Sequence, residues 1–152
     1  MAKRELDPFY YVDGMAKAKD GHSIPFARLP DPQARSRTYQ RLSDKAKVVY
    51  MTCKLCRQYH AKIDGLIQGD IKNFYFNRTL QKQYGLNDPN KTRAALVELV
   101  CKGFIEVVWN GATTRTKTIY KFSDQWKKLD KGQDIELSET SRTFIQGSAK
   151  IK

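Results

Sequence analysis

The chain has 152 residues, 40% of them hydrophobic and 29% charged, which is typical of one globular domain and excludes a disordered or fibrous protein. Its 28 lysines and arginines outnumber 16 aspartates and glutamates, and the net charge of +12 favours a polyanionic partner. No apolar run is long enough for a membrane helix. The N-terminus is charged and continues with Asp7-Pro8, which does not suit a signal peptide. We therefore expect a cytoplasmic protein without a membrane partner.

Residues 1–36 are expected to form an extended N-terminal arm. Glycines and prolines interrupt this segment repeatedly, and no helical period runs through its apolar residues. The stretch 24–30 is expected to lie extended against the body of the domain.

The first strong element is a predicted helix of about five turns that begins at Ser43 and ends near Gly65. Ser43 is a good N-cap and Asp44 places a negative charge in the first turn. Spacings of three and four define an apolar face of Ala46, Val49, Tyr50, Cys53, Cys56 and His60. The remaining surface carries cations that we expect to be solvated, namely Lys45, Lys47, Lys54 and Arg57.

The cysteines allow two interpretations. Cys53 and Cys56, together with His60 and the distant Cys101, could form a zinc site. The first three also share the apolar face of the predicted helix, where small reduced thiols pack well, and we expect core packing with no metal and no cofactor. With only two histidines, no glycine-rich phosphate loop and no hydrolase-like carboxylate cluster, the chain is not expected to be an enzyme.

A helix–turn–helix pattern follows. Residues 74–76 have strand character, Asn77 is a candidate cap for a helix that stops at Gly85, and Asp88 caps a helix that begins at Pro89 and ends at Lys102. Gly103 is the expected C-terminal stop.

A hairpin and a short helix complete the pattern. Residues 104–109 and 117–122 are predicted strands, joined across the turn signal Asn110-Gly111. A short helix containing Trp126 is expected next, and residues 130–152 are expected to form a flexible, mobile tail.

This order of elements predicts an α+β protein with a winged helix-turn-helix domain over residues 37–129. In such a domain the second helix of the motif enters the major groove and the hairpin reaches the backbone or minor groove. Amide, hydroxyl and cationic side chains gather at those positions, and the expected DNA-binding residues are Arg78, Lys82, Asn87, Asn90, Lys91, Thr92, Arg93, Thr114, Arg115 and Lys117.

Two stretches resemble known families. The run from Tyr39 to Tyr50 (YQRLSDKAKVVY), preceded by Leu29-Pro30, resembles the opening of the N-terminal domains of plasmid replication initiators from Gram-positive bacteria. The run from Ala94 to Ile105 (AALVELVCKGFI) resembles the join between recognition helix and wing in winged-helix proteins. Such initiators carry further domains, whereas this chain ends soon after the predicted wing. The resemblance therefore implies a stand-alone double-stranded DNA-binding protein of a plasmid, phage or conjugative element.

The expected role is that of an accessory or initiation factor at an origin of replication or transfer, with relaxase, initiator or other mobile-element proteins as further partners. A transcriptional repressor and a winged-helix protein-interaction module are the alternatives. A monomer or weak dimer is expected, because no long heptad is present for dimerisation. Asn90 and Arg93 are expected to set sequence specificity, and Lys91, Arg115 and Lys117 to set affinity.

Overall fold

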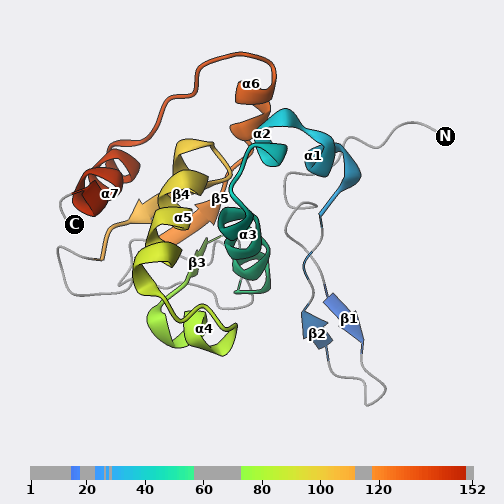
Figure 1. Cartoon of the computed structure of the whole chain (residues 1–152), viewed down its shortest axis with the longest axis vertical. Helices are drawn as coiled ribbons and strands as arrows, with labels where there is room; N and C mark the ends of the chain where they lie inside the picture. The colour runs from blue at the N-terminus through green and yellow to red at the C-terminus, as the bar shows by residue number, and fades with distance from the viewer. Residues whose placement is uncertain are drawn as a thin grey trace.

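The computed structural model describes residues 15–17, 23–25, 27, 29–56, 73–111 and 118–149, and the structural statements below concern these parts of the chain. The architecture is α+β, with helices around a small antiparallel sheet (Figure 1). Within these ranges, no helix has both the length and the apolar character to cross a membrane. In chain order the elements are β1 (Met15–Lys17), β2 (Ser23–Pro25), α1 (Asp31–Arg35), α2 (Arg37–Gln40), α3 (Asp44–Cys56), β3 (Asn73–Tyr75), α4 (Arg78–Gln83), α5 (Pro89–Cys101), β4 (Ile105–Trp109), β5 (Ile119–Phe122), α6 (Trp126–Asp130) and α7 (Glu139–Ala149).

The main sheet has three strands in the order β3-β5-β4, all antiparallel to their neighbours. Tyr120 in the central strand lies opposite Phe74 on one side and Val107 on the other, and the register shifts between Val107 and Trp109. The three predicted strands are therefore confirmed, with ends that differ by a residue or two. Phe74 stacks on Tyr120 and on Phe122, so the aromatic residues pair across the sheet.

The helices α4 and α5 begin at their predicted caps. The Asn77 side chain accepts a hydrogen bond from the Leu80 amide at 3.0 Å, and the Asp88 side chain caps α5. Gly85, with φ of 78°, turns the chain between the two helices. The predicted helix–turn–helix segment is therefore present over residues 78–101.

The core lies between α3, α5 and the sheet. On α3 the predicted residues Ala46, Val49, Tyr50, Cys53 and Cys56 are all buried, and both thiols are free. This confirms that they pack in the core, while Cys101 lies exposed at the end of α5. The expected end of the helix near residue 65 and His60 fall outside the described residues. In the part of the chain that is described, no three potential metal ligands lie together.

The position of Lys54 differs from the expectation that the cations of α3 are solvated. Its side chain is 1% exposed, because α3 is covered over a wider arc than its apolar positions predict and Thr52 is buried as well. The Lys54 Nζ lies 4.7 Å from the centroid of the Tyr50 ring. Burial lowers the pKa of Lys54 from 10.5 to about 7.

The expected N-terminal arm is only partly extended. Residues 31–40 instead form α1 and α2, which the prolines permit because Pro32 occupies the first turn of α1. Gln33 on α1 is buried, and its Nε2 donates to the Tyr50 hydroxyl at 2.8 Å. The strands β1 and β2 pair with each other in a separate hairpin, not with the main sheet (Figure 1).

The expectation of a mobile C-terminal tail is wrong for residues 139–149, because they form α7. The Ser138 side chain accepts a hydrogen bond from the Ser141 amide at 3.1 Å in the first turn of the helix. Phe144 is buried against the core, and α7 packs on both β4 and α5 (Figure 1). Phe144 and the adjacent, partly buried Ile145 pack this segment on the core, and two apolar residues in an otherwise polar stretch do not indicate that from sequence.

Candidate nucleic-acid interface

The first turn of α5 carries the two most accessible of the predicted contact residues on this helix. Asn90 and Lys91 are both exposed, and exposed Asn87 lies in the turn just before them. Pro89 begins the helix and Asp88 fixes its start, so these side chains project from a defined backbone. An amide and an ammonium group side by side are suited to a base edge and a phosphate respectively.

The neighbouring Thr92 points inward. Its side chain is fully buried, and its hydroxyl donates to the Asp88 carbonyl at 2.9 Å. This position therefore belongs to the interior face of α5, as do Ala95, Leu96 and Leu99. As the helix lies here, Thr92 does not present its hydroxyl to a DNA partner.

The backbone amides at the start of α5 are already occupied. Asp88 Oδ1 accepts from the Asn90 amide at 3.0 Å and from the Lys91 amide at 3.1 Å. Helix-start amides are often a binding place for phosphate, but here the Asp88 carboxylate takes the place that a phosphate oxygen would need. At this end of α5, the groups left to meet an anion are side chains.

Arg78 on α4 holds the turn rather than projecting from it. Its Nη1 donates to Gln81 Oε1 at 2.9 Å and to the Leu86 carbonyl at 3.1 Å, and its Nη2 donates to the Asn87 carbonyl at 3.1 Å. These bonds satisfy carbonyls of the turn and link α4 to the start of α5. The guanidinium that was expected to bind DNA therefore positions Asn87 in this structure.

Lys82 lies exposed in the last turn of α4, on the same helix–turn–helix segment as Lys91. It remains available to an anionic partner. The three predicted wing residues Thr114, Arg115 and Lys117 lie outside the described residues.

Arg93 lies on the flank of α5 that faces α7. Its guanidinium carbon is 4.7 Å from the centroid of the Phe144 ring, and the side chain is half-buried. A Cβ added at Gly147 would lie 3.9 Å from its Nη2, which places the guanidinium along α7. The residue expected to set specificity is therefore engaged by the C-terminal helix.

The residues of α7 that shape this flank were missed from sequence. The Ser141 hydroxyl is buried and accepts hydrogen bonds from the Val107 amide and from the Ser138 hydroxyl, both at 3.0 Å. The spacing of Ser141, Phe144 and Ile145 is helical and was the one local signal, but it contains only two apolar residues.

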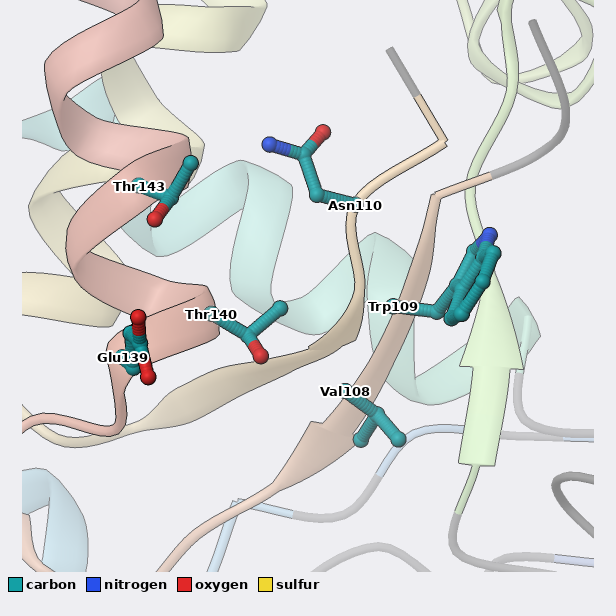
Figure 2. A pocket seen from close by; sticks show the side chains of 6 residues that line it. All are labelled: Val108, Trp109, Asn110, Glu139, Thr140 and Thr143. Atoms are coloured by element: carbon teal, nitrogen blue, oxygen red, sulfur yellow. The ribbon is translucent and has the colours of Figure 1, made fainter. Parts of the chain in front are cut away.

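A hollow of about 280 Å³ separates the start of α7 from the end of β4. In Figure 2 the Asn110 amide extends from the end of β4 toward Thr143 of α7, with Thr140 nearer the start of the helix. Among the described residues of its lining, Glu139 is the one that carries a charge. The hollow separates the base of the β4–β5 connection from α7.

Comparison of the chain with protein-family models, with curated proteins and with solved structures finds no match in any of the three.

Proposed function

We propose that this protein is a winged-helix protein that binds double-stranded DNA through α5. The observation that carries the proposal is the combination of the α4–turn–α5 segment with exposed Asn90 and Lys91 and the three-stranded sheet ordered β3-β5-β4. A helix that presents polar side chains from its N-terminal turn fits the major groove. In this proposal the connection between β4 and β5 is the wing.

The net charge of +12 supports a polyanion as the partner. Lys82 and Lys91 supply two exposed cations on the helix–turn–helix segment, beside the amides of Asn87 and Asn90. We assign phosphate contact to the lysines and base contact to Asn90, while Arg93 holds α7. Thr114, Arg115 and Lys117 stay predicted backbone contacts of the wing.

The resemblance of residues 39–50 to plasmid initiators supports a role at an origin of replication or transfer of a mobile element. A repressor would bind instead at a promoter. A binding titration on fragments from the protein's own genetic neighbourhood, with random duplex as competitor, separates these roles by the position of the fragment that survives competition.

The DNA-binding proposal is tested with two variants on a surviving fragment and on random duplex, over a series of salt concentrations. Lys91→Gln is expected to weaken both duplexes alike and to lower the slope of log K against log salt by about 0.9, the value for one phosphate contact. Asn90→Ala is expected to weaken the surviving fragment by about 1–3 kcal/mol and random duplex hardly at all.

Lys128→Gln on α6 is the control, because Lys128 is an exposed cation outside the helix–turn–helix segment. It should match the unmodified protein on both duplexes. Equal losses for Asn90→Ala on both duplexes would refute base contact by this residue. Failure of the unmodified protein to bind any duplex near physiological salt would refute DNA binding and favour a protein partner.

A further inference from the structure

A second hollow, of about 440 Å³, lies between α2, α6 and the C-terminal end of α5. Its lining includes four cationic side chains and one carboxylate, from Arg37, Arg41, Lys102, Lys131 and Asp130. The helices α2 and α6 lie side by side above α5 (Figure 1). The hollow is thus at the opposite end of α5 from Asn90 and Lys91.

Within the described residues, the cations of this hollow have no partner that neutralises them. All four side chains are exposed, and in the described parts of the chain none of them forms an ion pair or a side-chain hydrogen bond. Four positive charges against one negative charge leave the lining with three in excess. Like charges gathered around one hollow repel each other, and a bound anion relieves that repulsion.

The single carboxylate is occupied by another element. Asp130 Oδ1 accepts from the Thr38 amide at 3.2 Å and lies 3.4 Å from the Thr38 hydroxyl, which also lies 3.4 Å from the Trp126 carbonyl. The carboxylate thus ties α6 to α2, instead of pairing with a cation.

The walls of the hollow are fixed by close packing. Gly103, directly after Lys102, has φ of 77°, and a Cβ added there would lie 2.7 Å from the Trp126 backbone nitrogen. Trp126 stacks on Phe104 with 4° between the ring planes. The end of α5 and the start of α6 therefore meet without room for a side chain, and the cations stand on a preformed frame.

We propose that this hollow binds a phosphate group. Two guanidinium groups offer paired N–H donors that match phosphate oxygens, and two ammonium groups add charge. The hollow is larger than a lone phosphate needs, so it accommodates a phosphate with its attached sugar, either in a duplex backbone or in a free nucleotide. Cations at helix C-termini also stabilise the helix dipole, but α2 and α6 have only four and five residues, so this does not account for Arg41 or Lys131.

The first arm of the test measures binding of inorganic phosphate to the full chain by NMR titration. The double variant Arg41→Gln/Lys131→Gln is expected to bind phosphate about tenfold more weakly, since it removes two of the four cations. Asp130→Asn is expected to bind it more tightly, because the amide oxygen still accepts from Thr38 while the negative charge is gone. Thermal melting establishes that each variant is folded.

The control is Lys128→Gln/Arg142→Gln, which removes the same charge from a hollow that also contains Glu106, Glu136 and Glu139. It should bind phosphate like the unmodified protein. The second arm measures the salt dependence of duplex binding with the same variants. A lower slope in Arg41→Gln/Lys131→Gln alone identifies the phosphate as one of the DNA backbone, and an unchanged slope with weakened phosphate binding identifies a free phosphate.

The proposal is overturned if the double variant matches the control in both arms. It does not rest on the proposed function. If the unmodified protein binds phosphate but no duplex, DNA binding fails and this site stands.

Discussion

The two helices that flank α5 are attached to it in different ways. On one side, α3 buries seven of the side chains from Ala46 to Cys56, and Lys54 is one of them. On the other side, α7 is held chiefly by the Phe144 ring, the Ser141 hydroxyl and the contact with Arg93. α3 therefore belongs to the core, whereas α7 is docked by few groups that can be removed one at a time.

The largest expected effect comes from Phe144→Ala. Removing a fully buried aromatic ring costs about 3 kcal/mol of stability, and here the loss should release α7 while α3 stays packed. Hydrogen exchange is expected to show amides of α7 losing protection and those of α3 keeping it. Equal loss of protection in both helices would contradict the separation of the two flanks.

Lys54 gives the α3 flank a pH dependence of its own. Its pKa is lowered to about 7 in the fold, so above that pH the folded chain has released a proton that the unfolded chain still holds up to its ordinary pKa of 10.5. Since the unfolded state binds more protons, stability should rise from about pH 7 to pH 9. Burial raises the pKa of Cys53 and Cys56 above 9.0, so these thiols reverse the trend at higher pH.

Lys54→Met is expected to stabilise the protein by about 2 kcal/mol at pH 6 and to remove the rise between pH 7 and 9. Urea unfolding at a series of pH values measures both effects. Lys45→Met, at the start of the same helix, is the control and should leave the rise unchanged.

Ser141→Ala should cost about 1 kcal/mol, because it leaves the buried Val107 amide without its acceptor. The effect is expected in urea unfolding with no change in duplex binding. Ser141→Thr retains a hydroxyl and should recover part of the lost stability. If Ser141→Ala is as stable as the unmodified protein, the hydrogen bond from Val107 does not contribute to the free energy of unfolding.

The smallest expected effect is that of Arg93→Ala, about 0.5–1 kcal/mol in stability, from loss of the contact with the Phe144 ring. Sequence preference in duplex binding should be retained, in contrast to Asn90→Ala. If Arg93→Ala instead loses its preference for one DNA sequence over another, Arg93 contacts the bases, and α7 lies beside the bound duplex.

The elements that sequence predicted well are those specified by neighbouring residues. Asn77 and Asp88 cap helices within three residues of themselves, and the strands of the main sheet follow from short aromatic and β-branched runs. The placement of Asn90 and Lys91 on an accessible turn follows from the same local signals. These features need no knowledge of what the rest of the chain does.

The elements that sequence missed depend on contacts between distant segments. Arg93 was expected to face DNA because nothing near it in sequence indicates Phe144, and Lys54 was expected in solvent because its helix is enclosed by other segments. Buried Gln33 donates to the hydroxyl of Tyr50, 17 residues further along the chain, and the basic hollow is lined by residues of α2, α5 and α6. Such partners are set by tertiary packing, which local periodicity does not contain.

The hydrogen bond from Val107 to Ser141 has a consequence for self-association. β4 is an edge strand of the main sheet, and its Val107 amide points away from β5 to the α7 hydroxyl. An uncovered edge presents free backbone donors and acceptors that another chain can pair with. By lying along this edge, α7 denies a second molecule the place of a fourth strand beside β4.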